Sequence, residues 1–237
     1  MCTVSFYKGN SKVIITSNRD ENINRPLALP PTKITLEHSI VYCPLDPLHN
    51  GTWFVINHKG NVFVLLNGAE QKHTPNPRYR KSRGLILLDI INSNNFHKGW
   101  NLINLSNIEP FTIIAFVDDQ LFQIRWNEME KSLIQLETNK PYIWSSTTLY
   151  NEDIISKRER WFSEFLNQRN DDICSEDLIS FHTNTQKNDN QNGLVMNRNN
   201  SMLTKNITQC EITEDRFTLT HFDLISQEKS IITEILI

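Results

Sequence analysis

The sequence predicts an α+β protein built mainly from antiparallel sheets. Runs rich in Val, Ile, Phe and Thr occur as neighbouring pairs joined by short turns, helical patterns are clustered rather than alternating with strands, and the chain closes on three strand-like runs. Regular alternation would favour a doubly wound parallel sheet, whereas this order favours antiparallel pairing. No internal repeat or clear linker divides the 237 residues, so we expect one domain over residues 1–237.

Each expected element rests on its local pattern: alternation and short turns for strands, a 3.6-residue apolar period for helices, and Pro-rich or Asn-rich composition for loops. In the first half we expect a hairpin from 2–7 and 12–18, an irregular Pro-rich loop over 25–47, a hairpin from 52–57 and 61–66, a helix over 81–93 and a mixed segment near 96–105. In the second half we expect strands at 111–117, 120–126, 132–136 and 142–146, helices at 152–168 and 175–182, a polar loop over 183–200, and strands at 202–212, 216–224 and 229–236.

Composition indicates a soluble protein with a substantial core. Lys and Arg number 24 against 27 Asp and Glu, a net charge of −3 that argues against a nucleic-acid partner. The mean hydropathy is −0.43, and no apolar run approaches the ~18 residues that cross a bilayer. The first residues have neither the basic nor the apolar region of a secretory signal, so we expect a cytoplasmic protein without a membrane span.

The four cysteines form neither a metal-binding nor a disulfide pattern. They stand at Cys2, Cys43, Cys174 and Cys210, with no CxxC pair and no HExxH among the seven histidines. We therefore expect no metal, no cofactor and no disulfide framework. The last three cysteines are expected to pack as small apolar residues.

The first hairpin brings Cys2 near a cation. A turn at Gly9-Asn10 pairs residues whose numbers sum to 19, so that Cys2 faces Ser17 on a largely apolar face. Arg19 continues that face, within diagonal reach of Cys2.

If Met1 is removed, Cys2 presents both a thiol and a free α-amine. The amine has an ordinary pKa of ~7.7–8.0 and can act as a general base, while the Arg19 guanidinium favours the thiolate. Asp20 and Glu21, expected just past the strand end, offer a carboxylate to hold the amine. On spacing alone the alternative is equally open: Cys2 is a small residue at a strand start, and the polar run after it is a solvated turn.

Several motifs are spread over most of the chain: Met1–Val4, Asn18–Asn22, Arg25-Pro26, Gly51–Trp53, Asn67-Gly68, Ser82–Gly84, Ser145–Leu149 and, more weakly, the strands from Met202. These motifs resemble the NRDE family, the transport and Golgi organisation protein 2 family. The opening is also similar to the choloylglycine hydrolase and penicillin V acylase group of N-terminal-nucleophile hydrolases. This resemblance implies a four-layer α-β-β-α sandwich.

The resemblance assigns roles position by position. Cys2 would be the nucleophile with its own amine as base, Arg19 would lie beside the sulfur, and Asp20 or Glu21 would hold the amine. Asn67 resembles an oxyanion-hole asparagine, although Asn-Gly is also a turn signal in its own right.

Two positions depart from the family pattern, and one aromatic residue has two interpretations. Ser146 stands where a second amide donor is usual, and Lys205 stands where an arginine is usual, which keeps the charge and loses the bidentate geometry. Trp53 is either a core residue or a platform for a substrate.

The leading hypothesis is an N-terminal-nucleophile amidohydrolase or acyltransferase acting on a small amide or thioester, with an acyl or lipid-like substrate among the options. The alternative is a non-catalytic carrier of a lipid, acyl-CoA or haem that uses the same fold. The basic run 72–83 is either a solvated face or an attractor of an anionic substrate. Substrate identity and oligomeric state are not readable from these residues.

Overall fold

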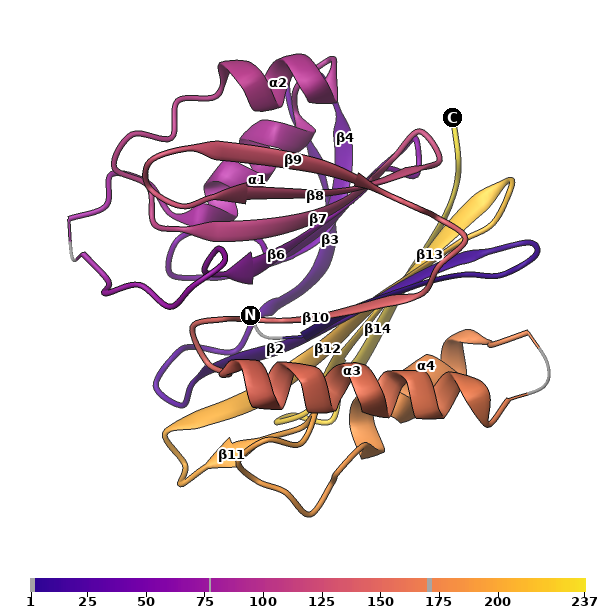
Figure 1. The fold of residues 1–237 in the computed structure, drawn as a ribbon. Coiled ribbons are helices and arrows are strands. Elements are labelled where there is room, and N and C mark those ends of the chain that lie inside the picture. The colour runs from indigo at the N-terminus through magenta and orange to yellow at the C-terminus, as the bar shows by residue number, and fades with distance from the viewer. Residues whose placement is uncertain (1–2, 77, 170–171) are drawn as a thin grey trace.

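Two antiparallel sheets of seven strands each form the centre of the molecule (Figure 1). The computed structural model describes residues 3–76, 78–169 and 172–237. Sheet A has the order β10-β1-β2-β12-β13-β14, with β11 paired to β12. Its strands are β1 Thr3–Lys8, β2 Val13–Asn22, β10 Tyr142–Ser145, β11 Asn197–Arg198, β12 Met202–Ile212, β13 Arg216–Asp223 and β14 Lys229–Ile235.

Sheet B follows the chain order β3-β4-β5-β6-β7-β8-β9, a meander. Its strands are β3 Leu29–Thr35, β4 Ile40–Leu45, β5 Phe54–Asn57, β6 Val62–Asn67, β7 Phe111–Val117, β8 Gln120–Trp126 and β9 Lys131–Leu136. The predicted pairs 52–57 with 61–66 and 111–117 with 120–126 are confirmed as β5-β6 and β7-β8.

In the described part of the chain, four helices cover the outer faces of the two sheets (Figure 1). Helices α1 (Arg83–Ile91) and α2 (Phe96–Leu102) lie on sheet B, and α3 (Glu152–Asn167) and α4 (Ser175–Asn184) lie on sheet A. Each of the first three begins at a Ser or Asn whose side chain accepts a backbone N–H of the first turn, an ordinary N-cap. The layers are therefore helix, sheet, sheet, helix, which confirms the predicted α-β-β-α sandwich.

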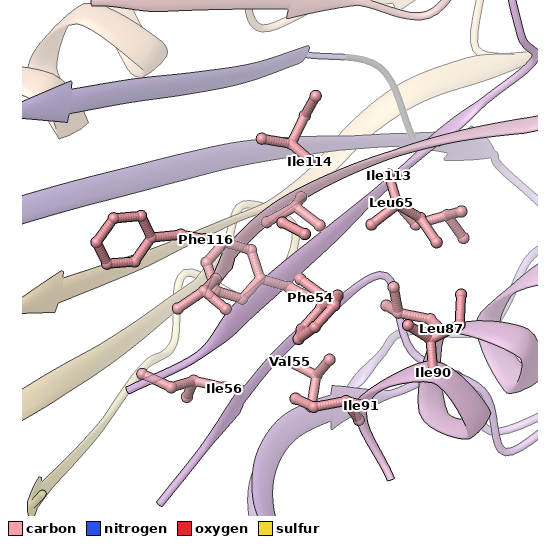
Figure 2. Packing of buried hydrophobic residues seen from close by; sticks show 14 of the residues in the cluster. Phe54, Val55, Ile56, Leu65, Leu87, Ile90, Ile91, Ile113, Ile114 and Phe116 are labelled. Atoms are coloured by element: carbon pink, nitrogen blue, oxygen red, sulfur yellow. The ribbon is translucent and has the colours of Figure 1, made fainter. Parts of the chain in front are cut away.

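Successive side chains of a strand point to opposite faces of a sheet, so the strands of sheet B contribute to two apolar layers (Figure 2). In sheet B, one side of the strands packs on Leu87 and Ile90 of α1. The other side meets sheet A, where the Phe6 and Phe116 rings lie 5.8 Å apart. A separate apolar cluster, which includes Ile14 and Phe162, holds α3 and α4 on the far face of sheet A.

The first hairpin has the predicted faces and a different register. Val4 pairs with Ser17, and Phe6 pairs with Ile15, so paired numbers sum to 21 rather than 19. The reason is the turn, which the Gly9 N–H closes by donating to the Lys12 carbonyl, giving a longer loop than Gly9-Asn10 alone. A shift of two keeps every side chain on its expected face. The predicted partner of Ser17, Cys2, lies outside the described residues.

Three other expectations about the chain were wrong. The stretch 25–47 contains β3 and β4, because Pro30 and Pro31 lie on the edge strand of sheet B where the register shifts and no ladder N–H is lost. The stretch 183–200 contains β11 and buries Leu194 and Met196. Asp20 and Glu21 lie within β2, not past its end, because β12 pairs with them.

Candidate active site

The motif residues Asn18–Asn22 lie on strand β2, and their side chains face two different environments. Its residues alternate between the faces of sheet A, so Ser17, Arg19 and Glu21 point toward sheet B and Asn18 and Asp20 point toward α3 and α4. The contacts agree with this: Arg19 meets Trp53 near β5, and Asp20 meets Tyr150 just before α3. The two charged residues predicted to act together therefore lie on opposite sides of one strand.

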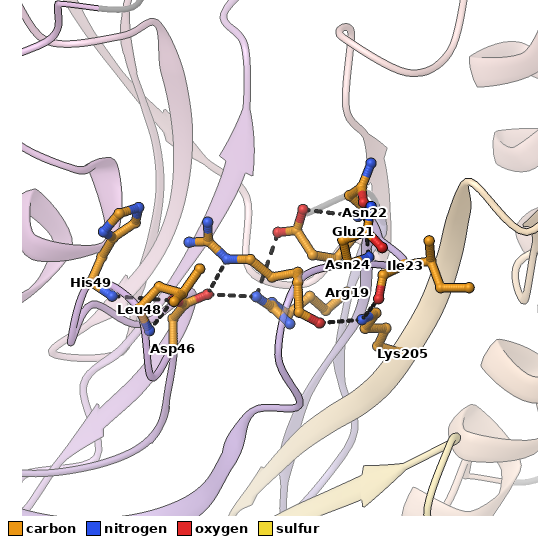
Figure 3. A network of polar contacts seen from close by, with 10 residues as sticks. Arg19, Glu21, Asn22, Ile23, Asn24, Asp46, Leu48, His49 and Lys205 are labelled. Carbon is orange, nitrogen blue, oxygen red and sulfur yellow. Dashed lines mark hydrogen bonds and ion pairs between the residues drawn. The ribbon is translucent and has the colours of Figure 1, made fainter.

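Arg19 is held between the Trp53 ring and the Asp46 carboxylate, and Figure 3 shows the contact with Asp46. Its guanidinium carbon lies 4.4 Å from the Trp53 ring centroid, and Nη2 donates to Asp46 Oδ2 at 2.8 Å. Glu21 Oε2 lies farther, 3.5 Å from the same Nη2. Trp53 is 3% exposed. It thus belongs to the core and supports the cation at the same time.

Asp46 is the residue of this network that sequence reasoning missed. It accepts from Arg19 and from Arg25 Nε, both at 2.8 Å, and its other oxygen accepts the backbone N–H groups of Leu48 and His49. Burial raises the pKa of the Asp46 carboxyl, but the Arg25 hydrogen bond and the charges of both arginines outweigh it and hold the pKa below its usual range. Its only sequence signal is an Asp followed by Pro in a loop.

Lys205 fixes the chain that leaves β2 (Figure 3). Its Nζ donates to the carbonyls of Ile23 and Arg25, and burial lowers its pKa. It lies at the irregularity of the β2-β12 ladder between Thr204 and Asn206. A lysine here binds backbone carbonyls, a task that needs no bidentate geometry.

A cavity of about 670 Å³ opens beside Arg19; we call it the Arg19 cavity. Five of its lining residues are cationic and three are acidic, an excess of positive charge in a chain of net charge −3. Arg19, Trp53, Glu21 and Asn67 all line it, as does part of the basic run 72–83. The charged lining residues are Arg19, Arg25, Arg80, Lys81, Arg83, Glu21, Asp46 and Glu109.

Asn67 ends β6 at a junction between the two sheets. Ser146 Oγ, which is buried, donates to the Asn67 carbonyl at 2.7 Å and lies 2.8 Å from Thr148 Oγ1. Gly68 has a φ of +85°, and a side chain there would meet Thr147 Oγ1 at 2.5 Å, so only glycine fits this turn. Ser146 uses its one proton on a backbone carbonyl and positions Asn67 rather than lining the cavity.

Asp20 belongs to a hydrogen-bond network on the other face of sheet A. Its carboxylate accepts from Tyr150 Oη at 3.0 Å and from Thr204 Oγ1. The guanidinium carbon of Arg158 lies 3.7 Å from the Tyr150 ring centroid, and Arg158 Nη1 donates to Thr3 Oγ1 at 2.6 Å. Tyr150 and Arg158 thus connect Asp20 to the first described residue of β1.

A second cavity, of about 530 Å³, lies on this side; we call it the Tyr150 cavity. Its lining includes Tyr150 and the aliphatic residues Leu149, Ile154 and Ile155. Thr147 and Thr148, which line this cavity, lie against Gly68, the residue after Asn67 of the Arg19 cavity. The Arg19 cavity is rich in cations, and the Tyr150 cavity is partly aliphatic.

His182 is a structural residue on the same face as Asp20. It is fully buried; its Nδ1 lies 2.6 Å from Asn18 Oδ1 and its Nε2 lies 2.7 Å from Ser5 Oγ. Burial, followed by the charge of Arg158, lowers its pKa to about 3, so the ring is neutral near neutral pH. Asn18, first in the family motif, serves this core contact.

The described cysteines are protonated groups with no role in the site. Cys43 and Cys210 are free and buried, which raises the Cys43 pKa to about 12 and the Cys210 pKa well above its usual value. Cys174 differs from the apolar packing residue expected: it is half-buried at the start of α4 and bonds Asp177, which raises its pKa. Cys2, the predicted nucleophile, lies outside the described residues.

Among residues 3–76, 78–169 and 172–237, no group of three or more His, Cys, Asp or Glu side chains is arranged to hold a metal ion. None of the helices in those ranges is long and apolar enough to cross a bilayer.

Comparison with known proteins decides the family. A family model described as transport and Golgi organisation 2 matches residues 1–222. The chain belongs to the transport and Golgi organisation 2 family. This confirms the resemblance found in the sequence motifs. Comparison with curated proteins gives no match.

A solved structure shares the fold of this family member at low sequence identity. The N-acylethanolamine-hydrolyzing acid amidase ortholog of Caenorhabditis elegans is 10% identical, with 88% of this chain and 92% of that chain covered and a TM-score of 0.62. A mutant conjugated bile acid hydrolase from Clostridium perfringens is 11% identical, with 99% and 96% covered and a TM-score of 0.48. The fold of this chain is that of the N-terminal-nucleophile hydrolases, as predicted.

Proposed function

We propose that this chain is an N-terminal-nucleophile cysteine amidohydrolase or acyltransferase, with Cys2 as the nucleophile. One observation carries the proposal: Arg19, Trp53 and Asn67 line one cavity. The strand that bears Arg19 also pairs with β1, which begins one residue after Cys2. A hydrolase fold in which a buried cation and an amide side chain line one cavity, with the cation on the strand that pairs with β1, supports acyl transfer at the chain start.

The proposed reaction has two stages. The α-amine of Cys2 takes the thiol proton, and the thiolate attacks the substrate carbonyl while Asn67 stabilises the oxyanion; one such donor is typically worth ~10²–10³ in rate. The C–N bond breaks as the leaving amine takes the proton from the α-amine, leaving a thioester on Cys2. Water then attacks the thioester, the C–S bond breaks, and the acid and the thiol are released; in an acyltransferase another acceptor replaces the water.

Arg19 and Asp20 have separate parts in this proposal. Arg19 favours the Cys2 thiolate through its charge. Asp20 is the better candidate than Glu21 to hold the α-amine, because Asp20 is buried and ordered by Tyr150 and Thr204, whereas Glu21 faces the Arg19 cavity.

The two cavities suggest a substrate with two unlike ends. The cationic wall of the Arg19 cavity favours an acidic or strongly polar group. Leu149, Ile154 and Ile155 in the Tyr150 cavity favour an aliphatic acyl group. We expect a small molecule that joins such groups through an amide or thioester.

The test is acylation and turnover of a panel of short N-acyl p-nitroanilides, followed by intact mass and absorbance. We expect the protein to lack Met1 and to gain one acyl mass on Cys2, and Cys2→Ala to abolish both acylation and turnover. Cys174→Ala is the matched control and should leave both unchanged, because Cys174 caps α4 away from the site. Retained turnover in Cys2→Ala, or Met1 still present on the active protein, overturns the catalytic proposal.

The same experiment separates the carrier alternative. A carrier would bind acyl compounds equally well in the natural protein and in Cys2→Ala, with no covalent adduct on either. Binding measured by calorimetry with a neutral and a carboxylated acyl amide would also report whether the cationic wall selects an acidic ligand.

A further inference from the structure

Five buried polar atoms near the Arg19 cavity have no hydrogen-bond partner among the described residues. They belong to four side chains that are at most 3% exposed. A buried polar group left unpaired destabilises the folded state, and such groups in native proteins normally bind something. The atoms are Ser17 Oγ, Trp53 Nε1, Asn206 Nδ2, Asn206 Oδ1 and His221 Nε2.

These atoms are clustered on the inner face of sheet A. Ser17 pairs with Thr208 on β12, and Thr208 pairs with His221 on β13, so the three form one row across neighbouring strands. The other ring nitrogen of His221 lies 2.9 Å from Thr208 Oγ1, which fixes the ring. Trp53 closes the cluster from sheet B, with its ring centroid 6.2 Å from that of His221.

Asn206 connects the cluster to the candidate site. It pairs with Arg19 on one side and with Asp223 on the other, and it lies two residues before Thr208 on the same face of β12. Arg19 and Trp53 line the Arg19 cavity. The cluster therefore lies between the Arg19 side chain and the apolar core.

The donors and acceptors of the cluster define what fits it. The Trp53 indole N–H only donates, Asn206 both donates and accepts, and Ser17 can do either. An anion would satisfy only the donors, and a cation only the acceptors. Burial lowers the pKa of His221 to about 4, so its ring adds no charge near neutral pH. A neutral group that donates and accepts is required.

We propose that Ser17, Trp53, Asn206 and His221 form a binding site for neutral hydroxyl groups, taken either by internal water or by an alcohol group of a ligand that reaches past Arg19. Ser17 and His221 lie two strand spacings apart, roughly 9.5 Å, so at least two hydroxyl oxygens are needed to serve the row. The proposal does not depend on the catalytic role of Cys2.

The Trp53 indole N–H gives a direct test by NMR on the full chain, with its signal assigned from a Trp53→Phe variant. A nuclear Overhauser contact between this proton and a long-lived water identifies internal water. A saturable shift of the signal on titration with ethylene glycol, lost in Asn206→Leu, identifies an alcohol site. Either result supports the hydroxyl site, and the absence of both in the natural protein overturns it.

The direction in which Asn206→Leu changes the melting temperature provides a second test. If the cluster binds hydroxyl groups, Asn206→Leu removes their partners and lowers the melting temperature. If nothing binds, the same change removes two unpaired atoms and raises the melting temperature, which overturns the proposal. Asn18→Leu is the matched control, because Asn18 is an equally buried amide on the neighbouring strand whose two ends are bonded to the protein, and it should lower stability in either case.

Discussion

The two faces of β2 differ in what their side chains contact. Toward α3 and α4, Asn18 and Asp20 are buried and bonded to protein groups such as His182 and Tyr150. Toward sheet B, Arg19 lines a cavity and contacts the Trp53 ring and the Asp46 carboxylate. The residues of the family motif therefore alternate between two environments: one set is buried in contacts that order the sheet, and the other set lines the Arg19 cavity.

The largest effect is expected on the structural face. Asn18→Leu removes bonds to two carbonyls and to the His182 ring, so the free energy of unfolding should fall by roughly 3–4 kcal/mol. Urea unfolding followed by circular dichroism measures it. A loss under 1 kcal/mol would show that this face is not the structural one.

On the cavity face, Arg19→Leu should slow alkylation of Cys2 by iodoacetamide about 100-fold at pH 7 and move its pH profile upward, because the thiolate loses its cation. Arg25→Leu is the control, since Arg25 shares Asp46 but is more exposed; it should change the rate less than about threefold. Equal effects of the two variants would contradict a specific role for Arg19.

Acid should weaken both faces through their histidines. The folded pKa of His182 is about 3 and that of His221 about 4, both below the ordinary 6.5. Their neutral forms therefore give full stability above pH 6.5, and stability falls as the pH drops toward those values, by about 2 kcal/mol per histidine at pH 5. Urea midpoints at pH 7 and pH 5 test this in the natural protein and in His182→Gln. An unchanged midpoint in the natural protein would exclude neutral buried rings.

The smallest effect is expected at the junction between the cavities. Ser146→Ala loses the bond to the Asn67 carbonyl, which should cost about 1 kcal/mol of stability. Thr148→Val, which removes only the Thr148 half of the contact, should cost less. If Thr148→Val costs more, Ser146 is not the residue that holds Asn67.

Local periodicity predicted most strands, and the sandwich was implied by the resemblance that the N-terminal motif carries. The errors came from long-range pairing. Nothing local shows that β12 extends β2 through Glu21, or that the edge of a sheet tolerates Pro30 and Pro31. The hairpin register was wrong because the turn length depends on how Lys12 closes it.

The candidate site was predictable where the motif names its residues and not elsewhere. Arg19 and Asn67, which the motifs name, line one cavity, and their catalytic roles stay predictions. Asp46 was missed because its role depends on two arginines distant in the sequence, Arg19 on β2 of sheet A and Arg25 in the connection between β2 and β3. Tyr150 was missed because a tyrosine before a helix has no distinctive pattern until Asp20 and Arg158 surround it.

The pairing of β2 with β12 also sets when the site can form. Arg19 lies beside Asn206, and a ribosome adding ~5–20 residues per second needs roughly 10–40 s to make the chain between them. Throughout that interval β2 lacks the strand that buries its cation, so a nascent chain cannot assemble this site. The complete β2-β12 ladder thus forms only after synthesis of the last strands, and a chain truncated before β12 would expose an unpaired strand edge prone to aggregation.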